Sequence, residues 1–146
     1  MIVIADSNII VSALITPKGV VASVFNAKSN LQFLTVDYLF DEVESHFDKI
    51  VKLSKRPQKE VWENYQELKA KIKTVVLHTQ IPQKYINEAY YITLDVDGKD
   101  VYFIALQRYK KHKLWTSDKA LIKGVEAKGY DIFITTAELR AKLYKK

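Results

Sequence analysis

Short apolar runs alternate with helical patterns along the chain, and this alternation restricts the fold more than any other feature. Residues 1–5 are apolar and β-branched, as is typical of a strand buried on both faces of a parallel sheet. Further strand candidates are 32–36, 74–78, 113–117 and 131–135, with helical patterns between them. Because parallel strands need crossover connections, we predict an α/β fold with a central, mostly parallel sheet of about five strands.

The longest helical pattern begins at Tyr38, where apolar residues recur at spacings of three and four as far as Ser54. Pro57 suits the first turn of another helix that continues to about Lys73. The two patterns predict a helical hairpin. Shorter helices are expected after Ser7 or Asn8, through 20–28, near 83–91, after 100, from 118 to 129, and after 135.

Length and composition predict one domain spanning residues 1–146, because 146 residues with 48% hydrophobic content can bury a full core. No apolar stretch approaches the roughly 18 residues of a membrane span, and the N-terminus lacks the features of a signal peptide. We therefore expect a cytoplasmic protein with no membrane partner. The absence of cysteine excludes disulfides, thiolate nucleophiles and cysteine-containing zinc sites.

The chain is basic, with a formal net charge of +6 and a pI near 9.3, which suits a polyanionic partner. Two clusters, 52–59 and 108–113, carry much of this charge. The second supplies candidate nucleic-acid contacts at Arg108, Lys110, Lys111 and Lys113. Basic residues near a helix C-terminus also complement the helix dipole, so charge alone leaves both interpretations open.

Acidic residues stand at positions that this fold would bring together. Asp6 follows the first strand and Asp118 the fourth, and the carboxyl ends of parallel strands form the functional edge of such sheets. If these two strands are neighbours, the two carboxylates converge on one crevice. Helices that start near 38 and 99 could add Glu42, Asp97 and Asp100.

Each of these acids also has a purely structural interpretation. Asp6 and Asp118 are suitable helix N-caps, and Glu42 is favoured near a helix start by the dipole alone. Asp97 lies in the sequence DVDG, which is typical of a turn. Neighbouring acids such as Asp37 leave the membership of the cluster open.

Clustered carboxylates repel one another unless they bind protons or a cation. Oxygen ligands favour Mg²⁺ or Mn²⁺, and such an ion suits the hydrolysis of a phosphodiester. Asn8, two residues after Asp6, and the hydroxyls of Thr116 and Ser117 could orient a carboxylate or a water beside the ion.

Four segments of the chain, in order, resemble PIN domains. IADSNIIVSALITPKG is similar to the family's opening, where a strand ends in Asp and an Asn follows two residues later. DYLFDEV resembles the helix that supplies the family's Glu, DGKDVYFIALQ its central Asp helix, and LWTSDKAL its late hydroxyl and Asp segment. The resemblance covers essentially the whole chain, and the order of the four segments is more specific than any one of them.

The resemblance implies a three-layer α/β/α fold and a Mg²⁺- or Mn²⁺-dependent ribonuclease site. Asn8 and Thr116 match polar supporting positions, and Asp97 matches an additional metal-binding acid of one branch. The acidic quartet of the family falls on Asp6, Glu42, Asp100 and Asp118. The chain departs from the family in its long charged helical region, 38–73, and in Ser7, where Thr is common.

Small members of this family are often VapC-type toxins. The resemblance therefore implies an RNA endonuclease that forms a homodimer and is silenced by an antitoxin protein. Two other classes remain as alternatives: a PIN-like module that binds RNA or protein without catalysis, and a receiver-like phosphoacceptor. The second would need an Asp after the third strand and a Lys after the fifth, where this chain has His78 and Thr135.

Overall fold

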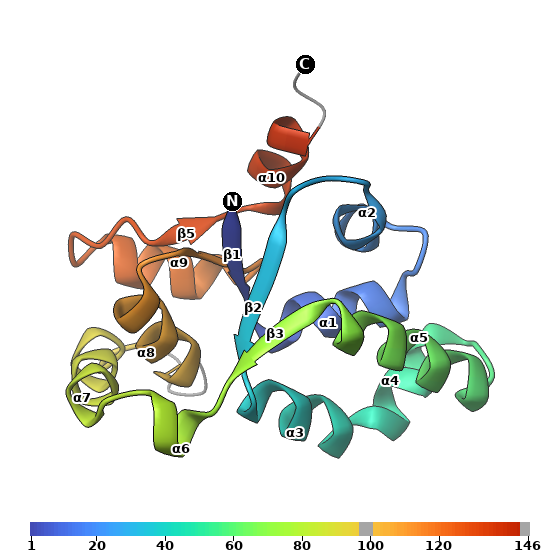
Figure 1. Cartoon of the computed structure of the whole chain (residues 1–146), viewed down its shortest axis with the longest axis horizontal. Helices are drawn as coiled ribbons and strands as arrows, with labels where there is room; N and C mark the ends of the chain where they lie inside the picture. The colour runs from blue at the N-terminus through green and yellow to red at the C-terminus, as the bar shows by residue number, and fades with distance from the viewer. Residues whose placement is uncertain (97–100, 144–146) are drawn as a thin grey trace.

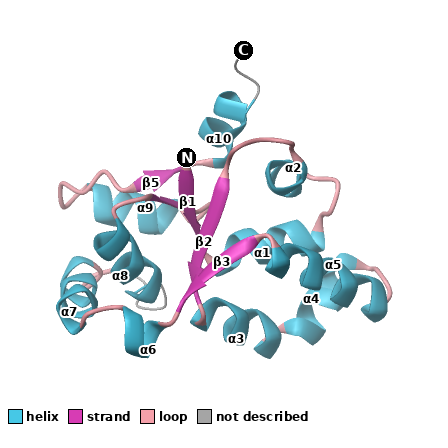
Figure 2. Ribbon diagram, viewed as in Figure 1, coloured by secondary structure: helices cyan, strands magenta, loops and turns pink. Residues whose placement is uncertain are grey.

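The computed structural model describes residues 1–96 and 101–143, and within them five strands form one parallel sheet (Figure 2). The strand order is β3-β2-β1-β4-β5, and every neighbouring pair is parallel. The strands are β1 (Ile2–Ala5), β2 (Gln32–Val36), β3 (Ile72–Val75), β4 (Lys113–Trp115) and β5 (Phe133–Ile134). The predicted α/β fold is confirmed, and so is the expectation that the first and fourth strands are neighbours.

Helices cover both faces of this sheet (Figure 1). One side carries α1 (Ser7–Ile15), α2 (Val20–Asn26), α3 (Tyr38–Ser45), α4 (Phe47–Ser54) and α5 (Gln58–Ala70). The other side carries α7 (Gln83–Ile92), α8 (Val101–Lys110) and α9 (Lys119–Glu126), while α6 (Leu77–Gln80) links β3 to α7 and α10 (Thr136–Leu143) packs against α2. The order of the strands reverses between β1 and β4, so the connections on either side of that point cover opposite faces.

No single helix among the described residues is long and apolar enough to cross a membrane. Only α1 and α2 taken together, bent at 101°, reach the required length and composition.

The central strands are buried on both faces, as their apolar sequences predict. Ile4, Leu114 and Trp115 have no exposed surface. The Trp115 ring packs 5.1 Å from that of Phe25, and its Nε1 donates to Thr136 Oγ1 at 3.0 Å. Burying each large apolar side chain stabilises the fold by about 1.5–3 kcal/mol, so this core fixes β1 and β4 relative to each other.

The predicted strand 74–78 is wrong at both ends, because β3 begins at Ile72 and ends at Val75. After Val75 the chain turns into α6, because the Asp37 side chain accepts a hydrogen bond from the first residue of that helix, Leu77. One oxygen of the Asp37 carboxylate, Oδ1, accepts from the backbone N–H of Leu77 at 3.0 Å and of Tyr38 at 3.1 Å. Asp37 therefore ties the ends of β2 and β3 together.

The predicted helix from Tyr38 to Ser54 is two helices, because the chain breaks at His46. This residue has φ −109° and ψ 16°, and its N–H donates to the Val43 carbonyl at 3.2 Å in a tightened turn. As a result α3 and α4 take separate directions, and both pack against α1 (Figure 1). The hairpin with α5 follows at Lys55, which adopts the left-handed conformation at φ 57°.

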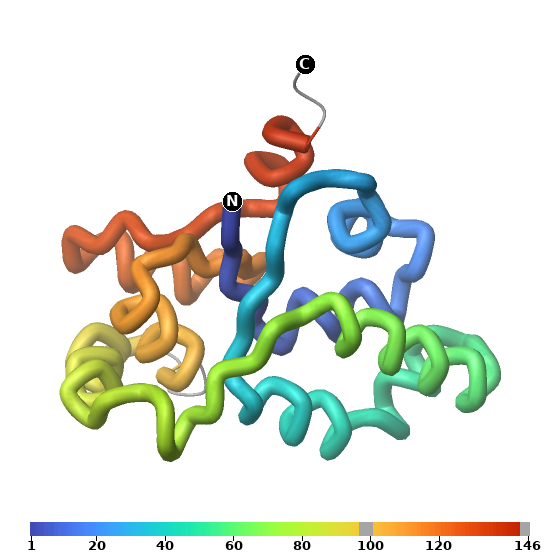
Figure 3. Tube along the Cα trace, in the orientation of Figure 1, coloured from blue at the N-terminus to red at the C-terminus, as the bar shows by residue number. Residues whose placement is uncertain are grey.

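All strands point the same way, so the sheet has an amino edge and a carboxyl edge. Met1 lies at the amino edge, where its carbonyl accepts from Gln32 N–H at 2.9 Å. The chain trace in Figure 3 shows α10 returning to this edge, where Met1, Leu139 and Leu143 line a common cavity. The residues that follow β1, β2 and β4 therefore lie at the opposite, carboxyl edge.

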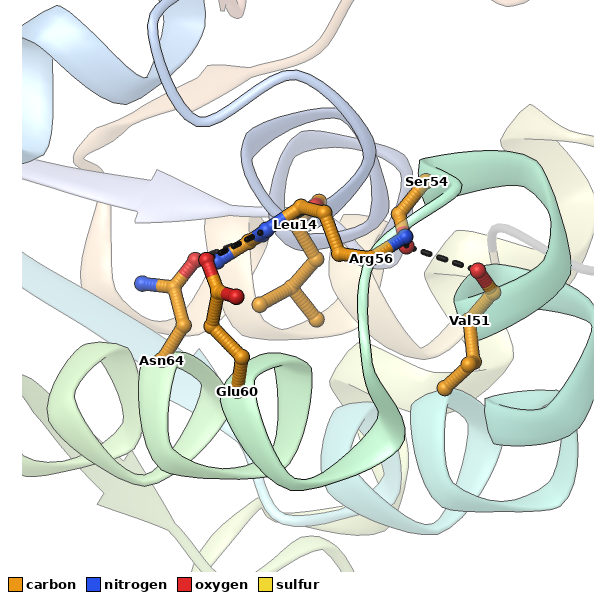
Figure 4. A network of polar contacts seen from close by, with 6 residues as sticks. All are labelled: Leu14, Val51, Ser54, Arg56, Glu60 and Asn64. Carbon is orange, nitrogen blue, oxygen red and sulfur yellow. Dashed lines mark hydrogen bonds and ion pairs between the residues drawn. The ribbon is translucent and has the colours of Figure 1, made fainter.

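Arg56, in the turn between α4 and α5, holds the C-terminal end of α1 (Figure 4). Its Nη1 donates to the Leu14 carbonyl at 2.9 Å and to Asn64 Oδ1 at 3.3 Å, and its Nε donates to Glu60 Oε1 at 3.2 Å. The last carbonyls of a helix lack hydrogen-bond partners within the helix, and the Arg56 guanidinium acts as the donor to one of them. The Ser54 hydroxyl, which accepts from Arg56 N–H at 3.2 Å, fixes the turn itself.

Replacing this guanidinium should destabilise the fold. We expect Arg56→Ala to lower the free energy of unfolding by about 1–3 kcal/mol, because a charged hydrogen bond to a partly buried carbonyl is lost. The matched control is Glu60→Ala, since the Glu60 side chain is 58% exposed and an exposed ion pair contributes less than about 1 kcal/mol. Urea denaturation measures both, and an unchanged midpoint for Arg56→Ala would contradict the assigned role.

Candidate functional site

Asp6 is the first residue after β1 and the N-cap of α1. Its backbone N–H continues the sheet by donating to the Trp115 carbonyl at 3.3 Å, and its Oδ1 accepts from Ile9 N–H at 3.1 Å. The side chain is fixed by these two elements and is only 1% exposed. A strand end that becomes a helix N-cap therefore buries a carboxylate at the carboxyl edge of the sheet.

Asp118 occupies the corresponding place after β4. It is the N-cap of α9, where its Oδ1 accepts from Leu121 N–H at 3.0 Å, and its own N–H donates to Thr116 Oγ1 at 3.1 Å. Because β1 and β4 are paired with Ala5 opposite Trp115, the two aspartates leave the sheet side by side. The structure thus brings Asp6 and Asp118 together at the reversal of strand order.

Burial raises the pKa of the Asp6 carboxyl from 3.8 to about 6. The nearby Thr116 hydroxyl and the backbone N–H groups of Ile9 and Asn8 lower this pKa, and the charge of Asp118 raises it, but burial has the largest effect. Asp6 Oδ2 has no well-formed hydrogen bond among the described residues. One buried oxygen is therefore left for a proton or a cation.

Glu42, which is half-buried on α3, presents a second such oxygen. Its Oε1 is buried and has no hydrogen-bond partner within the part of the chain that the structure describes. The residue stands between two cavities. The α3 cavity, of about 280 Å³, is lined by Tyr38, Asp41, Glu42, Ser45 and His46. The α1–α3 cavity, of about 170 Å³, is lined by Ser7, Asn8, Val11, Glu42, Val43 and His46.

The other predicted site residues divide into three groups. Thr116 is buried between the two aspartates, and Asn8 is exposed beside Glu42 in the α1–α3 cavity. Ser117 is exposed next to Asp118. Asp97 and Asp100 lie outside the described residues, so their predicted roles as ligands stay predictions.

The candidate nucleic-acid contacts lie away from this site. Arg108 and Lys110 are at the C-terminal end of α8, and Lys113 begins β4, so they are near the amino edge of the sheet, as is Lys111 between them. Arg108 Nε pairs with Glu88 Oε1 at 2.6 Å, and Lys113 Nζ lies 3.3 Å from Asp131 Oδ1. The structure does not bring these cations to the carboxylates.

The described residues fit a divalent cation in part. No group of three or more acidic or histidine side chains within 1–96 and 101–143 is arranged to hold a metal ion. Mg²⁺, however, commonly binds only one or two carboxylates and keeps several waters. Asp6 and Asp118 supply such a pair, and the unpartnered oxygens of Asp6 and Glu42 are hard donors of the kind it prefers.

Sequence reasoning assigned no site role to two residues that line the same cavity as Glu42. Tyr38 and His46 lie one helical turn before and after Glu42, and all three line the α3 cavity. The spacing of four residues on each side of Glu42 was the available signal. The pKa of the Tyr38 hydroxyl is raised by burial and then by the charges of Glu42 and Asp41, which places its ring beside these carboxylates.

Comparison with known proteins agrees with this geometry. A family model described as "PIN domain" matches residues 4–143. Among solved structures, a chain of VapBC2 from Rickettsia felis, crystallised bound to a DNA fragment from their promoter, is similar in fold, with a TM-score of 0.65. The alignment covers 92% of this chain and 97% of that chain at 13% identity, so the likeness concerns the fold alone. A search of curated proteins finds no matching sequence.

The buried Asp6 carboxyl gives a testable dependence of stability on pH. Its folded pKa is above its unfolded pKa, so its contribution to stability is fully present below about pH 4 and is lost as pH rises through about 6. The loss is on the order of 3 kcal/mol. The Asp6→Asn substitution avoids this loss of stability, because the amide stays neutral and its Oδ1 can still accept from the Ile9 N–H.

We therefore expect metal-free Asp6→Asn protein to be more stable than wild type at pH 7.5 and to lose this advantage near pH 4. Urea denaturation in EDTA at both pH values measures the difference. The control is Asp131→Asn, because the Asp131 side chain is 89% exposed and should give no such difference. A gap between wild type and Asp6→Asn that does not change with pH would contradict the role of burial.

Proposed function

The chain belongs to the PIN-domain family, and we propose that it is a Mg²⁺- or Mn²⁺-dependent endoribonuclease. The observation that carries this proposal is that two carboxylate oxygens, Asp6 Oδ2 and Glu42 Oε1, are buried with no hydrogen-bond partner among the described residues, while Asp118 lies beside Asp6 at the carboxyl edge of the sheet. Asp6, Asp97, Asp100 and Asp118 are the proposed metal ligands, with Glu42 completing the catalytic quartet of Asp6, Glu42, Asp100 and Asp118. The assignments of Asp97 and Asp100 rest on resemblance.

Fixed side chains give this site its chemistry. A bound divalent ion supplies a Lewis acid that polarises the phosphoryl oxygen and lowers the pKa of an attacking water. The N–H groups of Ile9 and Leu121 hold one oxygen of Asp6 and Asp118 respectively, so the other oxygen of each would be available to the ion. Glu42 would orient the water and take its proton; its Oε1, buried with no hydrogen-bond partner among the described residues, supports this role.

Neighbouring polar groups would support the carboxylates. Thr116 accepts from the backbone N–H of Asp118 and lowers the Asp6 pKa, so it favours the charged form of the Asp6 carboxyl. Asn8 and Ser117 are exposed beside the site and would orient waters. The chemistry does not depend on the basic residues near the amino edge, whose proposed contact with RNA would be remote from the cleaved bond.

Cleavage of RNA tests the proposal. We expect purified protein to cut single RNA chains internally in Mg²⁺ or Mn²⁺ and to lose this activity in EDTA. Asp6→Asn and Asp118→Asn should each lower the rate by more than about 100-fold, which exceeds the 10- to 100-fold loss typical of groups that only support a metal ligand. Asp131→Asn, at the amino edge, should cleave at the wild-type rate.

Two outcomes would contradict the proposal in different ways. Cleavage that persists in EDTA and in both site variants would reject this metal site. RNA binding without turnover in any divalent metal would instead indicate the non-catalytic binding module. The receiver-like alternative has no support in the fold, since Val76 and Thr135 follow β3 and β5.

We further propose that the protein acts in the cytoplasm as the toxin of a toxin–antitoxin pair. The solved structure with a similar fold is that of VapBC2 from Rickettsia felis bound to a DNA fragment from their promoter. The single PIN-like chain and the net charge of +6 are compatible with a small toxin that an antitoxin protein silences. A homodimer is part of this proposal.

The toxin role predicts that induced expression of the chain arrests growth. Asp6→Asn should relieve the arrest, because it removes the catalytic carboxylate while preserving the N-cap acceptor of α1. Colony counts after induction, at matched protein levels, measure the effect. Harmless expression of an enzyme shown to cleave RNA in solution would count against the toxin role and leave the nuclease proposal standing.

A further inference from the structure

We propose that Tyr38, supported by Tyr102, is the positioning residue on which a nucleotide base beside the cleaved phosphate stacks. This inference rests on the proposed nuclease function and assigns a second part of the same site. It concerns where the substrate is held rather than which groups act on the phosphate.

Position is the first argument. Tyr38 and Glu42 are four residues apart on α3, so their side chains occupy the same face of the helix. Both line the α3 cavity of about 280 Å³, which approaches the lower limit of about 300 Å³ for small-molecule pockets. A phosphate bound at the carboxylates would therefore bring its neighbouring nucleotide over the Tyr38 ring.

Rigidity is the second argument. The Tyr38 ring meets the Tyr102 ring of α8 edge-on, with centroids 4.9 Å apart and planes at 70°. The Tyr102 hydroxyl in turn makes a hydrogen bond with that of Tyr90 on α7, which is 53% exposed. Three elements thus hold one aromatic surface in place. A ring fixed before binding loses little entropy when a base stacks on it.

Charge is the third argument. The five residues lining the α3 cavity include Asp41 and Glu42 and no lysine or arginine. The basic side chains of α8 and β4 are near the other edge of the sheet. Among the described residues, no side-chain cation of the cavity lining is available to the phosphates, so beyond the proposed metal ion a nucleotide would be held here by stacking, because every base has an aromatic face.

The chain offers a matched control in a second tyrosine pair. Tyr85 of α7 and Tyr109 of α8 pack with centroids 5.2 Å apart. They belong to the same antiparallel helix pair as Tyr90 and Tyr102 but lie at its opposite end, since Tyr85 begins α7 and Tyr109 ends α8. Replacing Tyr85 removes packing similar to that lost on replacing Tyr38. Of these two tyrosines, only Tyr38 borders the carboxylates.

Binding of a short single-stranded RNA of mixed sequence tests the proposal. The RNA carries 2-aminopurine, whose fluorescence falls on stacking, and every protein also carries Asp6→Asn, so that the RNA stays intact in Mg²⁺. Tyr38→Leu should raise Kd roughly 5- to 50-fold and abolish the quenching, since a base loses its aromatic partner. Tyr38→Phe keeps the ring and should behave as the parent, and so should Tyr85→Leu.

Three results would overturn the proposal. They are parental RNA binding by a folded Tyr38→Leu protein, an equal loss in Tyr85→Leu, and a loss in Tyr38→Phe as large as in Tyr38→Leu. Failure of the proposed function is distinguishable, because RNA binding that depends on Tyr38 can persist in a protein that hydrolyses no RNA. Circular dichroism verifies that each variant is folded.

Discussion

The burial of one carboxylate, that of Asp6, is the constraint on which the site depends. Helices cover both faces of the sheet, and the pairing of β1 with β4 closes the space around the residue that follows β1. The result is a carboxyl group with a pKa near 6, beside the charge of Asp118, and one of its oxygens has no hydrogen-bond partner in the described parts of the chain. The free energy of unfolding of a native protein is only about 5–15 kcal/mol, so the cost of burying the charged Asp6 carboxylate is a substantial part of it. A cation at this oxygen would offset it, which connects the stability of the fold to its proposed chemistry.

The elements around Asp6 are fixed by contacts at some distance from it. Asp6 itself caps the start of α1, while Arg56 holds the end of the same helix through the Leu14 carbonyl. Asp37 joins the ends of β2 and β3 and sets where α3 begins, one turn before Glu42. The proposed RNA contact at Tyr38 depends on the same placement of α3. Residues that do not contact the substrate, such as Arg56 and Asp37, therefore help to position the site.

The sequence predicts the sheet and the meeting of Asp6 with Asp118, because apolar runs report burial and parallel strands leave the sheet at one edge. It does not predict the break at His46, where the apolar spacing continues unchanged while the backbone tightens locally, or the early end of β3, which depends on a hydrogen bond with the distant Asp37. Local charge also cannot show that Arg108 and Lys113 lie near the amino edge, or that each pairs with an acid. The spacing of Tyr38 and Glu42 is visible in the sequence, but only the structure shows that both line one cavity. Asp97 and Asp100 still rest on resemblance to PIN domains.

The central claim is that Asp6 is buried at a cation site. Its most direct test is a crystal of the wild-type protein grown with Mn²⁺ at pH 7.5, with the ion located from its anomalous scattering. The account predicts a peak within coordination distance of Asp6 Oδ2, shared with Asp118. Mn²⁺ bound only elsewhere on the chain, with Asp6 Oδ2 contacting protein alone, would contradict it.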